Sequence, residues 1–226
     1  MNIQRITLDN VLPKVFAGAE KDAPVCNSAV WLRQLSFEKG NAYMVEAESG
    51  TGKSSLCAFI YGNRRDYSGH ICFDDNDVKK FTVGQWCDIR RTAIALLPQE
   101  MRLFPELTAM ENIEIKNRLT HTFSRKEILD MLDCLEIGYK ADQKASRLSI
   151  GQQQRVAIVR TLCQPFDFII LDEPVSHLDA RNNAMAAQLI AEHARRNGAA
   201  IITTSVGNRL SLETVIDAAD IISVKL

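Results

Sequence analysis

The segment "VEAESGTGKSSLCAF", residues Val45 to Phe59, decides the fold, because a short apolar run leads into a glycine-rich turn and then a helical pattern. The turn nearly matches GxxxxGK(S/T), whose backbone N–H groups cradle phosphate oxygens at a helix N-terminus. Gly52, Lys53 and Ser54 complete the second half of this pattern, whereas Ala47 stands at its first glycine. The segment therefore predicts a phosphate-binding loop in an α/β protein, with one substitution.

The chemistry of such a loop assigns a role to each part of it. Gly50 and Gly52 permit the positive φ angles that a nest of inward-facing N–H groups requires. Lys53 reaches the β- and γ-phosphates, and the Ser54 hydroxyl is offered to Mg²⁺. Ala47 is tolerated if its φ is negative, and costs about 1 kcal/mol if its φ is positive. We expect nucleotide contacts from Ala47, Glu48, Ser49, Gly50, Thr51, Gly52, Lys53, Ser54 and Ser55.

A second candidate site element is the pair of carboxylates in "FIILDEP". The apolar run that ends at Leu171 is typical of a strand buried on both faces of a parallel sheet. Ligands bind at the carboxyl ends of such strands, so Asp172 is predicted to hold Mg²⁺ and Glu173 to polarise an attacking water. Two solvated carboxylates in a turn are the alternative, which the apolar run immediately before them disfavours.

Composition limits the classes of protein to which the chain can belong. Its 226 residues fit one α/β domain, and 46% hydrophobic residues suffice for a sizeable core. A formal net charge of −1 shows no basic excess, so no nucleic-acid partner is expected. Six cysteines without a CxxC pair favour free thiols over disulfides or zinc. No apolar run or leader predicts membrane insertion, so we expect a soluble, cytoplasmic chain that reaches membranes only through a partner.

Hydrophobic periodicity predicts the order of the elements. The block from about 100 to 147 has helical periodicity only, with a capping box at Ser124 and Glu127 and a stop at Gly138. We therefore predict a single domain, 1–226, with a core of 1–99 and 148–226 and an inserted helical subdomain. Strands are expected at 5–11, 30–38, 42–47, 69–75, 93–99, 166–171, 199–205 and 219–224, helices at 53–61, 83–91, 105–119, 124–138 and 179–197, and a loop at 16–29.

The stretch "RLSIGQQQRVAIVRTL", Arg147 to Leu162, resembles the signature segment LSGGQ(Q)QR of ATP-binding cassette (ABC) ATPases, the motor subunits of ABC transporters. The order of motifs makes the resemblance highly specific and extends it over essentially the whole chain. The phosphate loop at 47–54 is followed by "LLPQE", the signature at 148–152, the acidic strand end and then "SHLD", which is similar to the D-loop. Independently, Ser149 and Gln152 form a capping box, so a helix begins there with exposed N–H donors.

The resemblance implies a P-loop NTPase fold with a central, mostly parallel sheet flanked by helices, an N-terminal antiparallel β region and the helical subdomain. It implies that the signature faces ATP held by the opposite subunit of a head-to-tail dimer. Gln99 would sense Mg²⁺ and the attacking water, and Glu173 would be the catalytic base, aided by Lys53. Phe16 matches an adenine-stacking aromatic, with an ordinary core aromatic as the alternative. The further residues implied are Ser149, Ile150, Gly151 and Gln152 in the signature, Asp179 in the D-loop, and Ser54, Gln99 and Asp172 around Mg²⁺.

Three positions depart from the family pattern. Ala47 replaces the first loop glycine, Ile150 replaces the first signature glycine, and Ser205 replaces a histidine that contacts the γ-phosphate. Serine cannot carry positive charge, so the transition state loses a contact worth roughly 10- to 100-fold in rate. His177 could compensate from the D-loop, or could be an ordinary solvated histidine. ATP binding is expected to survive and hydrolysis to be slow.

The leading functional hypothesis is the ATP-binding and ATP-hydrolysing subunit of an ABC transporter. It would dimerise with itself or with another ABC ATPase and drive a separate integral membrane permease from the inner face of the cell membrane. A nucleotide-dependent clamp or regulatory subunit with little turnover is the alternative. A non-transport ABC ATPase that acts through a membrane partner is also open, whereas the chromosome or repair kind would need longer insertions. The sequence reveals neither the transported substrate nor the direction of transport.

Overall fold

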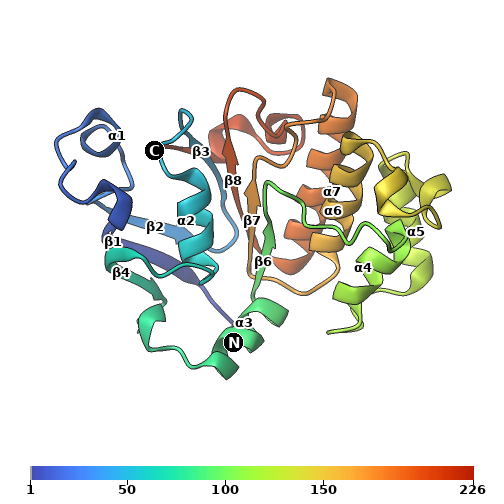
Figure 1. Cartoon of the computed structure of the whole chain (residues 1–226), viewed down its shortest axis with the longest axis horizontal. Coiled ribbons are helices and arrows are strands. Elements are labelled where there is room, and N and C mark those ends of the chain that lie inside the picture. The colour runs from blue at the N-terminus through green and yellow to red at the C-terminus, as the bar shows by residue number, and fades with distance from the viewer. Residues whose placement is uncertain (1) are drawn as a thin grey trace.

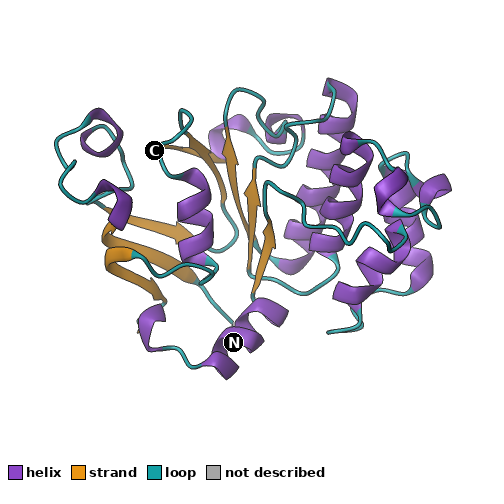
Figure 2. Ribbon diagram, in the orientation of Figure 1, coloured by secondary structure: helices purple, strands orange, loops and turns teal. Residues whose placement is uncertain are grey.

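The computed structural model describes residues 2–226, which form two sheets with helices around them (Figures 1 and 2). The larger sheet has five parallel strands in the order β6-β7-β8-β3-β9. This confirms the predicted α/β class with a central, mostly parallel sheet. These strands are β3 (Ala42–Glu46), β6 (Ile94–Leu97), β7 (Phe168–Asp172), β8 (Ala200–Ser205) and β9 (Ile221–Lys225).

The smaller sheet is antiparallel, with the strand order β2-β1-β4-β5, as the N-terminal β region was predicted to be. In the first part of β1 the side chains alternate, so that Ile6 and Leu8 enter the core, until a shift in the pairing with β4 after Asp9 breaks the pattern. The short strand β5 had no signal in the sequence. The strands are β1 (Arg5–Pro13), β2 (Gln34–Glu38), β4 (Tyr67–Phe73) and β5 (Asn76–Asp77).

The parallel sheet separates two hydrophobic cores. Ile169 and Leu171 of β7 face one core with the helices α4 to α7, while Phe168 and Ile170 face the other with α2 and the antiparallel sheet. Figure 1 shows the same division, with α2 and α6 on opposite sides of β7. The helices are α1 (Ala23–Cys26), α2 (Lys53–Ile60), α3 (Val83–Thr92), α4 (Ala109–Asn117), α5 (Arg125–Cys134), α6 (Ile150–Leu162) and α7 (Ala180–Asn197).

Several local predictions were wrong. The strand predicted at 30–38 begins only at Gln34, and the helix predicted at 105–119 begins only at Ala109, each after a turn. The loop predicted at 16–29 contains the one-turn helix α1. Helix α5 ends at Cys134 rather than at Gly138, because Glu136 takes a positive φ of 53° and stops the helix earlier. The predicted subdomain boundary at residue 147 stays a prediction, since α6 packs on both α4 and α5 and continues that helical layer.

Candidate nucleotide-binding and hydrolysis site

The predicted phosphate loop joins the end of β3 to the first residue of α2, Lys53. Gly50 and Gly52 have φ values of +84° and +101°, which side-chain-bearing residues rarely adopt. Ala47 is not among the positive-φ residues of the described chain, so its extra methyl group adds no left-handed strain. The substitution of the first loop glycine is therefore compatible with the loop conformation.

The loop is supported from below by Trp31, which the sequence patterns did not single out. Its indole Nε1 donates a hydrogen bond of 2.9 Å to the carbonyl oxygen of Thr51, and the side chain is fully buried. A Cβ added to Gly52 would lie 2.9 Å from Cζ2 of Trp31, so only glycine fits at this position. Trp31 thus fixes the position of Thr51 and Gly52 relative to the hydrophobic core.

Phe16 lies beside the same loop, at the end of a 3₁₀ turn formed by Lys14–Phe16. The ring is half-buried and packs against the core that contains Trp31. Its Cε2 would lie 3.4 Å from a Cβ placed on Gly52. The structure therefore brings Phe16 next to the phosphate loop, and its stacking on adenine stays a prediction.

The Lys53 ammonium group folds back over the loop. Its Nζ donates hydrogen bonds to the carbonyl oxygens of Glu48, at 2.7 Å, and Ala47, at 3.4 Å. Burial lowers the pKa of Lys53, and the nearby carboxylates of Glu173 and Asp172 partly oppose this shift. A buried cation without a carboxylate in direct contact is well suited to receive an anionic ligand such as a triphosphate.

The three predicted magnesium ligands, Ser54, Gln99 and Asp172, line one cavity of about 330 Å³. Asp172 is 4% exposed, and its Oδ1 accepts a hydrogen bond of 2.7 Å from the Thr204 hydroxyl. Oxygen donors of this kind suit Mg²⁺, which is usually held by one or two carboxylates together with substrate phosphates. Residues 2–226 contain no group of three or more His, Cys, Asp or Glu side chains that could hold an ion by themselves.

Glu173 follows Asp172 in a left-handed backbone conformation, with φ of +51°. Its side-chain Oε2 accepts a hydrogen bond of 3.2 Å from Nε2 of Gln99, so the predicted base and the predicted sensor are in contact. Its backbone N–H donates to the carbonyl oxygen of Thr204 at 3.2 Å. Left-handed residues other than glycine cluster at functional sites, where the surrounding structure holds them in place.

Gln154 is a second residue that sequence reasoning missed. It extends from α6, where its Nε2 donates to the carbonyl oxygen of Glu173 at 3.2 Å and its Oε1 accepts from the backbone N–H of His177 at 3.0 Å. The run "QQQ" gives no indication of which glutamine turns inward. Helix α6 is thus joined directly to the acidic strand end and to the D-loop.

The signature lies at the start of α6, where Ser149 and Gln152 form the predicted capping box. Ile150 is 53% exposed, and a Cβ on Gly151 would lie 2.8 Å from the carbonyl oxygen of His177. Because the sheet separates α6 from α2, the signature does not join the phosphate loop of its own chain (Figure 1). Asp179 caps α7 by accepting a hydrogen bond of 2.8 Å from the backbone N–H of Asn182.

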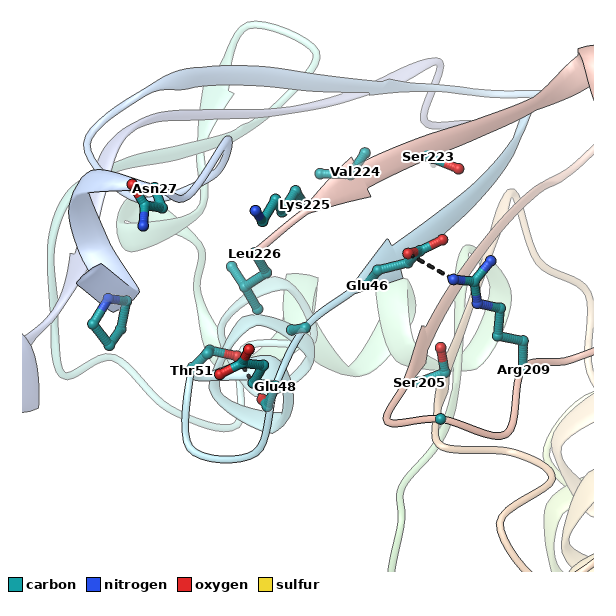
Figure 3. Close-up of a pocket in the computed structure, with 13 residues that line it drawn as sticks. Asn27, Glu46, Glu48, Thr51, Ser205, Arg209, Ser223, Val224, Lys225 and Leu226 are labelled. Carbon is teal, nitrogen blue, oxygen red and sulfur yellow. Dashed lines mark hydrogen bonds and ion pairs between the residues drawn. The ribbon is translucent and has the colours of Figure 1, made fainter.

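Ser205 ends β8 beside Glu46 of β3 and is 5% exposed. Ser205 lines a cavity of about 690 Å³, and three residues of the phosphate loop line the same cavity: Ala47, Glu48 and Thr51. Figure 3 shows Arg209 and Glu46 facing one another above Ser205, joined by an ion pair of 2.9 Å.

His177 does not line this cavity or the metal cavity. Its Nδ1 lies 2.9 Å from the Ser176 hydroxyl, and the side chain is exposed. Within one chain, the structure therefore gives no support to compensation by His177 for the missing histidine at position 205.

A glycine loop between β3 and α2, an aspartate at the end of a neighbouring parallel strand and a glutamate beside it define the P-loop class of nucleotide hydrolases. Comparison with known proteins narrows this class. The family model "ABC transporter" matches residues 33–176, and the chain belongs to this family. It is an ATP-binding cassette, the type of domain that binds and hydrolyses ATP in these transporters.

Relatives and solved structures agree with this assignment. The chain is 35% identical over 159 residues to the lipoprotein-releasing system ATP-binding protein LolD 1 of Chlorobium chlorochromatii, covering 69% of this chain and 65% of that protein. It is 30% identical over 202 residues to the ABC transporter ATP-binding protein YvrO of Bacillus subtilis, covering 88% and 86%. The dimeric bacterial ABC cassette MJ0796 superposes with a TM-score of 0.76 at 25% identity, covering 97% of this chain and 94% of that one.

A further relative is a much longer protein than this chain. The chain is 33% identical over 162 residues to the macrolide export ATP-binding/permease protein MacB of Campylobacter jejuni, covering 69% of this chain and 25% of that protein. The helices of residues 2–226 include none with the length and hydrophobicity to cross a bilayer. The predicted family and the predicted ATPase class are confirmed.

Proposed function

We propose that this chain is the subunit of a membrane transporter that binds Mg·ATP, dimerises around it and hydrolyses it at Glu173. The observation that carries this proposal is the contact between Gln99 and Glu173 beside the cavity lined by Ser54 and Asp172. Both residues come from the carboxyl ends of neighbouring parallel strands, β6 and β7, where ligands of such sheets bind.

Nucleotide binding is assigned to the phosphate loop and its surroundings. The N–H groups around Gly50 to Ser54 would hold the phosphates, and Lys53 would exchange its contacts with loop carbonyls for phosphate oxygens. Phe16 would contact adenine. Ser54, Gln99 and Asp172 would hold Mg²⁺, which supplies positive charge to the phosphates when bound.

Glu173 is assigned the task of orienting and deprotonating the attacking water. Its Oε2 accepts from Gln99, so the carboxylate is fixed while its other oxygen stays available for a water. The left-handed backbone at Glu173, held by Thr204 and Gln154, keeps the carboxylate at the end of β7.

The dimer is inferred from the exposed start of α6. Ser149 and Ile150 are exposed on the surface. They begin α6, which lies on the opposite side of the sheet from α2, so they do not face the phosphate loop of their own chain (Figure 1). A second ABC ATPase, identical or different, would place its ATP there. The MJ0796 cassette, which superposes on this chain, was solved as a dimer.

The membrane partner is proposed to be a separate permease, which this ATPase would serve from the cytoplasmic face. The relatives support this, since LolD belongs to a lipoprotein-releasing system and MacB combines an ATP-binding part with a permease. A regulatory subunit with little turnover is the second candidate, and Ile150 and Ser205 favour it. An ABC ATPase that acts through a membrane partner without transport is a third.

The test compares the purified chain with Glu173→Gln and Lys53→Ala, using a fluorescent ATP analogue for binding and phosphate release for turnover. We expect Glu173→Gln to bind Mg·ATP normally and to hydrolyse it at least about 100-fold more slowly, because a general base is lost. Lys53→Ala should lose binding. Glu106→Gln, an exposed carboxylate on the surface, serves as the matched control and should change neither quantity. Equal binding with no hydrolysis by either wild type or Glu173→Gln would support the regulatory subunit instead.

A further inference from the structure

The residues after Gln99 form a strained turn. Met101 and Arg102 are consecutive, and both have positive φ values, 56° and 52°. Such angles are uncommon for any residue other than glycine, and the left-handed conformation costs each residue free energy. We call the segment from Gln99 to Arg102 the glutamine turn. Because two adjacent residues are strained, the rest of the molecule must hold this turn in place.

Arg160 is the side chain that holds it. Its Nη1 donates a hydrogen bond of 2.8 Å to the carbonyl oxygen of Arg102, and its Nη2 donates to that of Met101. Arg160 is half-buried, which lowers the pKa of its guanidinium group, and it forms no ion pair with a carboxylate of residues 2–226. A half-buried guanidinium without a counter-ion thus directs two of its donors to these carbonyl groups.

The chain beyond the turn is held from a second helix. Asn112 of α4 is fully buried, and its Oδ1 accepts from the Phe104 N–H at 2.7 Å while its Nδ2 donates to the Phe104 carbonyl at 3.0 Å. Helices α4 and α6 pack against each other. The segment that begins at Gln99 is thus fixed to the same helical layer at two points.

We propose that Arg160 is a positioning residue that couples the signature helix α6 to the catalytic glutamine. The same helix carries Ser149 at its start and Arg160 in its last turn. A displacement of α6 when the signature meets ATP would therefore move the glutamine turn and change the 3.2 Å contact between Gln99 and Glu173. This role rests on the proposed function of Gln99 and Glu173 in hydrolysis.

The first test replaces Arg160 by methionine, which keeps the apolar length of the side chain. Hydrogen exchange is measured without nucleotide on peptides covering residues 98–104. Loss of two charge-assisted hydrogen bonds should accelerate exchange there by at least about tenfold. With Mg·ATP, the turnover rate should fall by a larger factor than the Kd for ATP rises, because the phosphate loop is not touched whereas Gln99 is displaced.

A rescue experiment separates positioning from general stabilisation. The side chain of Arg102 is 67% exposed, pairs only weakly with Glu100 and lines the cavity of Ser54 and Asp172. Arg102→Gly therefore relieves the strain of the turn but also removes a charge from that cavity, so its rescue is read from hydrogen exchange without nucleotide. Arg160→Met combined with Arg102→Gly should recover slow exchange to within about threefold of the wild type, since glycine adopts this conformation without strain.

Two control substitutions lie outside the glutamine turn: one relieves a left-handed residue, and the other removes a different arginine of α6. His121→Gly relieves an exposed left-handed residue with φ of 50° between α4 and α5, and should not rescue Arg160→Met. Arg155→Met removes another arginine of α6, which donates a hydrogen bond of 2.8 Å to the Leu135 carbonyl oxygen. Any change in hydrogen exchange that Arg155→Met causes should not be reversed by Arg102→Gly.

Each outcome decides the proposal. Unchanged exchange in Arg160→Met, or equal rescue by Arg102→Gly and His121→Gly, overturns it. If Arg160→Met does not fold, Arg160→Lys is used, and exchange intermediate between the wild type and fully exposed amides is expected. Wild-type exchange in Arg160→Lys then overturns the proposal. A wild-type chain that neither binds nor hydrolyses ATP defeats the proposed function alone, since the exchange arm is read without nucleotide.

Discussion

Because Trp31 packs closely against Gly52, the substitution Gly52→Ala is predicted to weaken ATP binding. Gly52 has φ of +101°, and the new Cβ would lie 2.9 Å from Trp31 Cζ2 and 3.4 Å from Phe16 Cε2. The fully buried indole cannot move away without losing its 2.9 Å hydrogen bond to the Thr51 carbonyl. The loop must therefore distort where it is expected to hold phosphates.

The cost has two parts. A side-chain-bearing residue in the left-handed region costs about 1 to 2 kcal/mol. Losing or weakening the indole hydrogen bond adds about 1 kcal/mol. The sum of about 2 to 3 kcal/mol corresponds to an increase in the Kd for ATP of roughly 30- to 160-fold.

Gly50→Ala is the matched variant, because Gly50 has φ of +84° but nothing within 4 Å of the position that an added Cβ would take. It should show the backbone cost alone, about 5- to 30-fold in Kd. Titration of each variant with a fluorescent ATP analogue in Mg²⁺ gives the comparison. Adding Trp31→Phe to Gly52→Ala should recover part of the affinity. Equal Kd values for Gly50→Ala and Gly52→Ala would refute the role of Trp31.

Three further predictions concern the departures from the family pattern and one buried histidine. Ser205→His should raise the turnover rate by roughly 10- to 100-fold, because the 690 Å³ cavity beside it leaves room for a ring and the transition state gains a charged contact; phosphate release measures this. Ile150→Gly should relieve crowding on the order of 1 kcal/mol at the dimer contact, giving several-fold faster turnover at an unchanged Kd for ATP. Burial lowers the pKa of His193, so the unfolded chain binds a proton more readily than the folded protein. The free energy of unfolding should fall as the pH drops from about 7 to about 5, and in urea titrations His193→Gln should show a smaller fall.

Much of the fold was accessible from sequence because its signals are local. The capping boxes at Ser124 and Ser149 each join residues three positions apart, and both occur as predicted. The apolar run of β7 and the glycines of the phosphate loop likewise report backbone conformation and burial directly. The end of α5 was harder to predict, since Glu136 stops this helix through a positive φ that no pattern announces.

The order of motifs also indicated which site residues belong together. The structure does place Ser54, Gln99 and Asp172 around one cavity, because parallel strands end at the same edge of a sheet. It also resolved the open question at Ala47, whose φ no sequence rule could supply. The roles of these residues in binding and hydrolysis stay predictions.

By itself, the sequence determined the family, the order of strands and helices, and the residues offered to phosphate and metal, because short spacings encode local geometry. Only the tertiary structure decided that Trp31 supports the phosphate loop, that Gln154 joins α6 to the Glu173 backbone and that Arg160 holds the glutamine turn. These contacts join segments far apart in the chain. Their partners are main-chain carbonyl groups, which every residue carries, so only the folded arrangement can select which one is bound.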